Sequence, residues 1–440
     1  MATKVNVRNI ALRAIISILE DEEKSHIVVR NIMKENKFSD VDKGFFLRLV
    51  EGTVERKITL DFVISKYSKT KLEKLKKPIK NLLRMSIYQI LYMEHVPDRS
   101  AVDEAVKICK KRSLMGLSGF VNGVLRSISK DKNEIIELIN DSSDGIKYSV
   151  TEDLLEILGE KKEKVLSNLY NERKINARLN LSKHTKAEII AMLVASGVKV
   201  SDNPYIENAV YIDKFGDITE NPVYAMGLIT IMDGASMIPG LVSGVKKGDT
   251  VVDVCAAPGG KAIHIAEMLQ FTGTVYARDL TVNKVNLINE NIKRSGVKNV
   301  RADVFDARKT DEKLIGKADV LICDVPCSGL GVINNKSDIK YRIKKSDIDS
   351  LATLQKEILD SSISYLKDGG VLVYSTCTIT DEENISMVKY LLSKYNLKLS
   401  SLNPFLNEKL QTDTTKEGYL EIMPGDYDMD GFFIARFIKG

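Results

Sequence analysis

The sequence predicts a multi-domain protein with an all-α N-terminal bundle, a small α+β bridging subdomain and a C-terminal α/β domain. Residues 1–140 carry apolar positions at the i, i+3, i+4, i+7 spacing of helices and almost no strand pattern. From about Gly248, apolar strands alternate with amphipathic helices, which is typical of a doubly wound parallel sheet. The patterns predict domains at residues 1–140, 141–240 and 241–440.

Helix signals recur through the N-terminal segment. Ala11, Ile15 and Ile18 fall on one helix face. Ser39 or Asp40 provides an N-cap for the next helix, and Pro78 suits the first turn of a later one. We therefore expect a bundle of amphipathic helices here.

Charge is distributed unevenly along the chain, whose net charge is +5. Residues 1–150 hold 28 Lys and Arg against 20 Asp and Glu, a net +8, which leaves −3 for the rest. The run at residues 69–80 is rich in lysine and includes Lys74, Lys76 and Lys77. Such a run either neutralises RNA phosphates without reading sequence or forms a charged loop between helices.

Strands and helices alternate over the rest of the chain. The bridging subdomain is predicted to hold strands at 177–181, 198–200 and 209–212 around a helix at 187–194. The C-terminal domain is predicted to hold strands at 250–254, 274–279, 300–304, 318–324 and 371–375. Its predicted helices lie at 261–269, 282–295, 350–366 and 382–392, and 431–437 is expected to be a final antiparallel strand.

A glycine-bearing turn follows the first strand of the C-terminal domain. It reads Cys255-Ala256-Ala257-Pro258-Gly259-Gly260-Lys261 and leads into a helix, whose N-terminus favours an anion such as a carboxylate. It is not G-x-G-x-x-G, so the pyrophosphate of a dinucleotide is not indicated. Asp279 closes the second strand, where a carboxylate accepts hydrogen bonds from ribose hydroxyls. Asp306 follows the third strand and is a candidate for the adenine amino group. Each acid taken singly is also explained as a strand-end cap, but the set fits S-adenosylmethionine.

Two cysteines follow the last strands of the predicted parallel sheet. Cys327 lies in Asp324-Val325-Pro326-Cys327-Ser328, and Cys377 lies in Ser375-Thr376-Cys377-Thr378. The fourth and fifth strands are neighbours in the usual order of this fold class, so both thiols are expected on one rim beside the cofactor. Ionised cysteine is a strong nucleophile, which indicates group transfer through a covalent intermediate.

These three motifs resemble those of the RNA (cytosine-5)-methyltransferase family, and the helical segment resembles the NusB-like RNA-binding domain. The combination is similar to the bacterial 16S rRNA methyltransferases of the RsmB/Fmu/Sun type. The resemblance implies a Rossmann-like class I methyltransferase domain that uses S-adenosylmethionine as its cofactor. It also implies 16S rRNA as the substrate and partner.

Residue roles follow from this resemblance. It assigns Cys377 as the attacking thiolate, Cys327 to product release and Asp324 to activation of the cytosine. It places the methyl donor against residues 255–261, Asp279, Asp306 and Asp324, with Asp303 as a rival to Asp306. Arg178 and Asn180 match a segment associated with RNA contact.

The chain departs from its relatives in one place and leaves alternatives open. Met232-Asp233-Gly234-Ala235-Ser236-Met237 stands where relatives tend to have Gln-Asp-Glu-Ser-Ser-Met, so roles of that Gln and Glu are not transferred. The alternatives are a tRNA enzyme of the same chemistry and a non-catalytic RNA-binding assembly factor. A DNA cytosine methyltransferase, the other alternative, uses the Pro-Cys thiol as nucleophile.

Other patterns bound the location and the cofactors. No run of about 18 uncharged apolar residues occurs, and the N-terminus lacks a signal-peptide core, so a cytoplasmic location without membrane contact is expected. The histidines and cysteines show no metal-ligand spacing, so no metal is expected. A monomer is expected.

Overall fold

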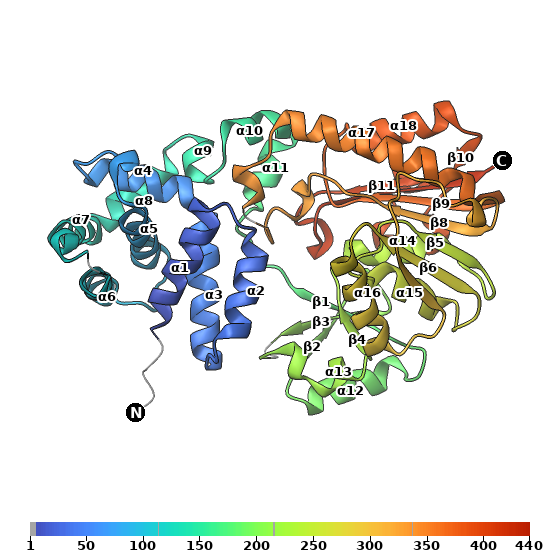
Figure 1. Cartoon of the computed structure of the whole chain (residues 1–440), viewed down its shortest axis with the longest axis horizontal. Helices are drawn as coiled ribbons and strands as arrows, with labels where there is room; N and C mark the ends of the chain where they lie inside the picture. The colour runs from blue at the N-terminus through green and yellow to red at the C-terminus, as the bar shows by residue number, and fades with distance from the viewer. Residues whose placement is uncertain (1–5, 113, 214–215, 337) are drawn as a thin grey trace. The chain divides into compact units, whose positions relative to one another are not determined.

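A computed structural model describes residues 6–112, 114–213, 216–336 and 338–440 of the chain (Figure 1). The chain forms two compact units. The helical unit comprises Met1–Gly159 and Ile333–Ile343, and the α/β unit comprises Glu160–Val332 and Lys344–Gly440. The helical unit thus extends beyond the predicted boundary at residue 140, and the small and large sheets fall in one unit. The division into three independent domains stays a prediction.

Helices make up the N-terminal part of the helical unit, as predicted. Ser39 caps α3, because its hydroxyl accepts the Asp42 N–H at 3.2 Å, and Pro78 lies in the first turn of α5. The helices are α1 (Val7–Glu20), α2 (Ser25–Glu35), α3 (Asp40–Glu55), α4 (Lys57–Tyr67), α5 (Lys77–Tyr92), α6 (Asp98–Lys111), α7 (Ser118–Lys130), α8 (Lys132–Asn140), α9 (Asp144–Lys147) and α10 (Glu152–Leu158).

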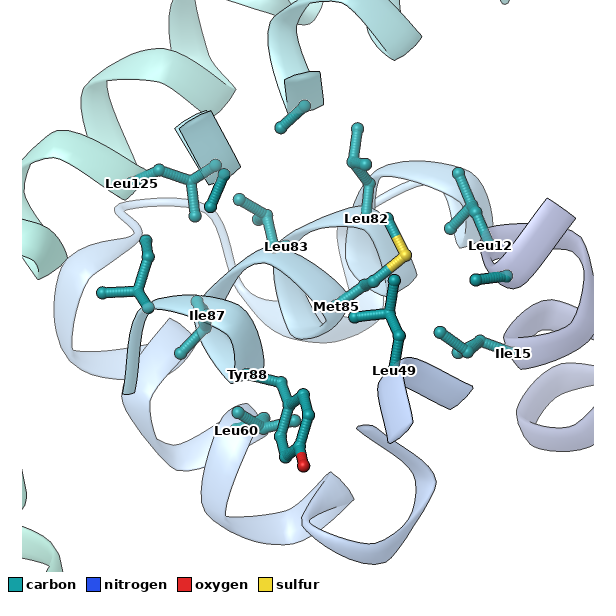
Figure 2. Packing of buried hydrophobic residues seen from close by; sticks show 14 of the residues in the cluster. Leu12, Ile15, Leu49, Leu60, Leu82, Leu83, Met85, Ile87, Tyr88 and Leu125 are labelled. Carbon is teal, nitrogen blue, oxygen red and sulfur yellow. The ribbon is translucent and has the colours of Figure 1, made fainter. Parts of the chain in front are cut away.

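Helix α5 forms the centre of the helical unit. Leu82, Leu83, Met85 and Ile87 are almost fully buried and lie among side chains from the surrounding helices (Figure 2). A helix that is apolar on most sides is stable only when neighbours cover it all round. The packing of α5 therefore explains why this segment folds as a bundle.

One charged side chain is enclosed by the same helix. The Arg84 side chain is 2% exposed, and its guanidinium donates to both oxygens of Asp61 at 2.6 and 2.7 Å. It also lies 3.2 Å from the carboxylate of Glu20. Removal of one partner from a buried ion pair leaves uncompensated charge, which costs about 3–5 kcal/mol.

We expect Arg84→Met to lower the midpoint of the helical unit's thermal unfolding transition markedly. Arg99→Met is the matched control, because that side chain is 94% exposed and lies 3.7 Å from Asp103. The control is expected to change stability by less than about 0.5 kcal/mol. Differential scanning calorimetry of both variants compares them, and equal midpoints would contradict the buried network.

A short segment from late in the sequence belongs to the helical unit. Within Ile333–Ile343, Tyr341 donates to the carbonyl of Glu55 at 2.7 Å and accepts the Lys57 N–H at 3.1 Å. Asp338 accepts the Ser25 hydroxyl at 2.7 Å. The sequence contains no signal for this excursion, because its contacts join residues about 280 to 310 positions apart.

The α/β unit begins with a four-stranded antiparallel sheet in the order β2-β3-β1-β4. Three of these strands were predicted, and the fourth, three residues long, was missed. The elements are α11 (Lys162–Ser167), β1 (Ile175–Leu179), α12 (Lys186–Ala195), β2 (Lys199–Asp202), β3 (Ala209–Asp213), α13 (Pro222–Ala225), β4 (Ile229–Ile231) and α14 (Gly234–Ser243).

The larger sheet confirms the predicted doubly wound architecture. Its order is β10-β12-β9-β8-β5-β6-β7, with β11 paired to β12; strands β5 to β9 run parallel and β12 is antiparallel to β9. Its elements are β5 (Thr250–Asp253), α15 (Gly260–Met268), β6 (Thr274–Asp279), α16 (Val282–Ser295), β7 (Val300–Val304), β8 (Ala318–Asp324), α17 (Lys345–Ser362), β9 (Leu366–Thr376), α18 (Ile385–Lys394), β10 (Leu397–Leu399), α19 (Asp413–Glu417), β11 (Tyr419–Ile422) and β12 (Phe432–Lys439).

Helices cover both faces of this sheet (Figure 1). Val251 belongs to a core shared with α14, α15 and α16, whereas its neighbour Val252 belongs to a core shared with α17 and α18. Successive side chains of a strand point to opposite faces, so continuous apolar runs are required here. Both faces are thus closed, which leaves the carboxyl ends of the strands for chemistry.

Candidate active site

The glycine-bearing turn lies between β5 and α15. Gly259 adopts φ 103° directly before the helix, a conformation in which side chains are strained, and its amide donates to the Ala256 carbonyl at 2.6 Å. A Cβ there would also lie 3.3 Å from the Ile288 side chain. The turn is therefore tight and directs the N-terminus of α15 toward the edge where the strands end.

Two of the predicted cofactor acids lie along the same edge. Asp279 closes β6, is buried, and accepts the Ala257 N–H at 3.1 Å, so it holds the glycine-bearing turn in place. Asp306 follows β7 and pairs with Arg308 at 2.8 Å, and hydrogen bonds from Arg308 lower the pKa of Asp306 to about 2. Asp303 lies inside β7, whereas Asp306 lies beyond its end. The adenine contact by Asp306 stays a prediction.

Lys261 and Asp324 join the cofactor turn to the first cysteine segment. The ammonium of Lys261 lies 2.7 Å from Asp324, whose other oxygen accepts the Ser375 hydroxyl at 2.7 Å. Burial alone would lower the pKa of Lys261, but attraction and hydrogen bonding from Asp324 raise it. Asp324 thus receives one donor from α15 and one from β9.

A pocket of about 380 Å³ opens beside this pair. The turn from Cys255 to Lys261 contributes part of its wall, as do Asp253, Asp324 and Asp233. One oxygen of Asp253 accepts the Cys255 N–H at 3.4 Å, and no hydrogen-bond donor within the described parts of the chain reaches the other. Burial, with repulsion from Asp324, raises the pKa of Asp253 to about 8.

The raised pKa of Asp253 predicts how the stability of the fold changes with pH. Between about pH 4, the ordinary Asp value, and pH 8, folded Asp253 holds a proton that the unfolded chain releases, so stability falls as pH rises. Asp253→Asn carries no charge at any pH. Across this window it should therefore gain stability relative to the parent, by about 1.4 kcal/mol for each unit that the pH rises. Urea unfolding at pH 5 and pH 8 measures the change.

Asp319 is the matched control. Burial opposes ionisation there, but hydrogen bonds from Lys367 and the Thr250 N–H lower the pKa of Asp319. Asp319 therefore binds a proton less tightly in the folded state than in the unfolded chain. Its ionised carboxylate stabilises the fold at neutral pH, and this stabilisation is lost as the pH falls. Asp319→Asn should lose stability at pH 8, opposite in sign to Asp253→Asn. A shared sign would contradict the assignment.

The two thiols meet at the ends of neighbouring strands. The Sγ atoms of Cys327 and Cys377 lie 3.1 Å apart, and β8 and β9 pair in parallel up to Asp324 and Ser375. This confirms the prediction that both lie on one rim. The hydrogen bond with Cys377, together with burial, raises the pKa of Cys327 well above its ordinary value. Either thiol can donate this hydrogen bond, and the raised pKa of Cys327 favours its protonated form.

Two glycines bring the backbones behind the thiols together. The Gly331 N–H donates to the Cys377 carbonyl at 3.0 Å, and the Gly431 N–H donates to the Gly331 carbonyl at 2.9 Å. A Cβ on Gly331 would collide with the Gly431 carbonyl and lie 2.8 Å from that of Cys377. Close approach of three segments requires glycine here.

Of the residues expected to contact RNA, two are buried and three are exposed. Arg178 is 2% exposed and forms an ion pair with Glu267, and Asn180 is buried and donates to the Gly227 carbonyl at 3.2 Å. Both support the packing of β1 in this structure, and their RNA contact stays a prediction. The predicted lysines are exposed around the start of α5: Lys74, Lys76 and Lys77.

Comparisons with known proteins agree with this geometry. The family model of the 16S rRNA methyltransferase RsmB/F matches residues 242–438, and that of the NusB family matches residues 5–130. The probable ribosomal RNA small subunit methyltransferase B of Bacillus subtilis is 35% identical, covering 99% of both chains. The chain belongs to the RsmB/F methyltransferase family.

Another relative and two solved structures are similar over about two thirds of the chain or more. The ribosomal RNA small subunit methyltransferase B of Cronobacter sakazakii is 28% identical over all of both chains. The crystal structure of PH0851 has a TM-score of 0.80 and 25% identity, covering 99% of this chain and 100% of that one. A methyltransferase homologue from Pyrococcus horikoshii has a TM-score of 0.56 and 27% identity, covering 66% and 94%. Similarity to known proteins thus extends over both the helical and the α/β parts of the chain.

The described parts of the chain hold neither a membrane-spanning helix nor a metal-binding cluster. No helix there is both long and apolar enough to cross a membrane. No cluster of three or more His, Cys, Asp or Glu side chains there is arranged to hold a metal ion.

Sequence reasoning missed two acids beside the site. Asp253 precedes the cofactor turn and was assigned only to a strand, although a carboxyl at the end of a buried strand was a usable signal. Glu383 lies six residues after Cys377 and is fully buried. Nothing in the sequence distinguishes it from Glu382, which pairs with Lys345 near the surface.

Proposed function

We propose that this chain transfers a methyl group from S-adenosylmethionine to C5 of a cytosine in 16S rRNA, through a covalent bond between Cys377 and C6. The observation that carries the proposal is the 3.1 Å approach of two thiols beside the turn of a methyltransferase domain. An amine or a hydroxyl can accept a methyl group without help from a thiol. Cytosine C5 is too weak a nucleophile to do so, and a thiol that adds to C6 activates it.

The thiols take different roles in this scheme. Cys377 adds to C6, which makes C5 enamine-like. The C5–methyl bond forms as the methyl group leaves the donor's sulfur. A base then takes the C5 proton, and the electrons of that C–H bond restore the C5–C6 double bond and expel Cys377 as the thiolate. Cys327, whose thiol lies 3.1 Å from that of Cys377 and has a raised pKa, assists that last release. Asp324 activates the cytosine by donating to, or sharing a proton with, the region of ring nitrogen N3, which draws charge off the ring.

The cofactor residues fit the group that the family implies. S-adenosylmethionine supplies an electrophilic methyl group on a positively charged sulfonium. We expect the N-terminus of α15 to bind its carboxylate and Asp279, at the end of β6, to bind its ribose. Asp324 lines the adjoining pocket, where a carboxylate complements a cation.

The helical unit is proposed to hold the RNA. Lys74, Lys76 and Lys77 are exposed together and bind phosphates without reading bases. Their removal should weaken binding to all RNA sequences alike and reduce its salt dependence. A cytoplasmic location and a monomeric state complete the proposal.

The decisive test is methylation of deproteinised 16S RNA with a donor labelled in its methyl group, followed by mapping of the modified base. The proposal expects label on C5 of one cytosine in 16S RNA. Transfer to tRNA alone would favour a tRNA enzyme of the same chemistry. RNA binding without transfer to either would favour an assembly factor.

A further inference from the structure

A buried carboxylate lies behind the paired thiols and has no role in the scheme above. Glu383 is 0% exposed and precedes α18, on the same segment as Cys377. Taking a carboxylate out of water is costly unless hydrogen bonds replace its hydration. The groups that donate hydrogen bonds to Glu383 therefore show which parts of the chain it holds together.

Four hydrogen bonds satisfy Glu383. Its Oε1 accepts the Ser328 N–H at 2.9 Å and the Gln355 amide at 3.0 Å. Its Oε2 accepts the hydroxyls of Ser328 at 2.5 Å and Thr380 at 2.7 Å. Bonds to an ionised acceptor are the stronger kind, and the low local dielectric strengthens them further.

These donors come from the two cysteine segments and the helix beside them. Ser328 directly follows Cys327, and Thr380 lies three residues after Cys377. Gln355, in α17, also donates to the Pro326 carbonyl at 3.0 Å, which fixes the residue before Cys327. The Ser328 and Thr378 hydroxyls lie 2.6 Å apart and close the network between the segments.

We propose that Glu383 is a positioning residue that sets the separation of the Cys327 and Cys377 thiols by holding both segments to one carboxylate. The inference deepens the proposed function, since it explains how both thiols reach one base, but the spacing is measurable without any RNA. Glu383 acts through Ser328 and Thr380 and does not touch the substrate.

Thiol spacing is tested in the full-length protein with dibromobimane, which fluoresces when it bridges two neighbouring thiols. Cys327→Ala gives the background from other cysteines. Glu383→Ala is expected to bridge at least about tenfold more slowly than the parent, because displacements near 1 Å have large effects on such reactions. Glu383→Gln keeps the side-chain shape and one acceptor oxygen, so it should recover part of the rate.

Glu382→Gln is the matched control, since it changes the neighbouring carboxylate near the surface. It should bridge at the parental rate. Circular dichroism establishes that each variant is folded. Parental bridging by folded Glu383→Ala would overturn the proposal. Should that variant fail to fold, Glu383→Gln decides in the same assay, and a rate equal to the parent's would overturn it.

Kinetics separates positioning from a purely structural role. Glu383→Ala should lower kcat for methyl transfer by about 100-fold while the KM for S-adenosylmethionine changes less than about threefold. Equal losses in donor binding and kcat would overturn the positioning role. If bridging responds as expected but the parent methylates no RNA, the positioning stands and the proposed function fails.

Discussion

Cys377→Ala is expected to abolish methyl transfer to RNA, with a loss of at least about 10⁴-fold in kcat, because removal of a nucleophile leaves only binding and electrostatic effects. The Cys327 thiol lies 3.1 Å from that of Cys377, and the hydrogen bond between them, together with burial, raises the pKa of Cys327. The thiol at position 327 therefore does not substitute for the missing thiolate. A filter-binding assay with methyl-labelled donor measures the loss.

Binding of S-adenosylmethionine separates this effect from misfolding. Calorimetric titration should give Cys377→Ala and the parent the same affinity, because the cofactor turn and Asp279 lie on other strands. Cys109→Ala is the control for loss of a buried thiol, since Cys109 lies in α6 of the helical unit. It should retain full activity. Substantial methylation by Cys377→Ala would refute the role of Cys377 as nucleophile.

Cys327→Ala is expected to trap the protein on its RNA. If Cys327 assists expulsion of Cys377 from C6, its loss leaves the forward addition intact and slows the last step. The adduct should survive denaturing electrophoresis as a protein band that carries labelled RNA, whereas the parent releases its product. Most of the active enzyme should accumulate in this form within one turnover.

The double variant and the labelled donor sharpen this experiment. Cys327→Ala combined with Cys377→Ala should form no adduct, because the attacking thiol is gone. The trapped adduct should carry the donor's methyl group, which would show that the reaction stops after methyl transfer. An adduct in Cys377→Ala would reverse the two roles, and no adduct in Cys327→Ala would remove Cys327 from product release.

The sequence predicted the parallel strands accurately because their signal is local. Strands buried on both faces read as continuous apolar runs, and β6, β7 and β8 begin and end at the predicted residues. Short strands were missed where the signal is weak, as at β10 and β11, whose positions depend on pairing with β12. The excursion of Ile333–Ile343 into the helical unit was also missed, because it depends on contacts remote in sequence.

The site residues also divide into those that local sequence reveals and those that depend on contacts remote in sequence. Each strand ends at a residue that local pattern reveals, so Asp279, Asp324, Cys327 and Cys377 were all assigned to one edge of the sheet. The pairing of β8 with β9 then brings the two thiols together. Local pattern does not reveal the surroundings of Arg178: folding encloses it against Glu267, and its contact with RNA stays a prediction.

What the sequence determined by itself is the order of elements, the two cysteine segments and the cofactor turn, because each rests on residues close together in the chain. Tertiary structure alone decided the 3.1 Å thiol contact, the ion pair of Lys261 with Asp324, and the burial of Glu383. Hydrogen bonding and burial raise the pKa of Cys327 and surround Glu383 with donors, and both effects depend on neighbours that only the folded chain assembles.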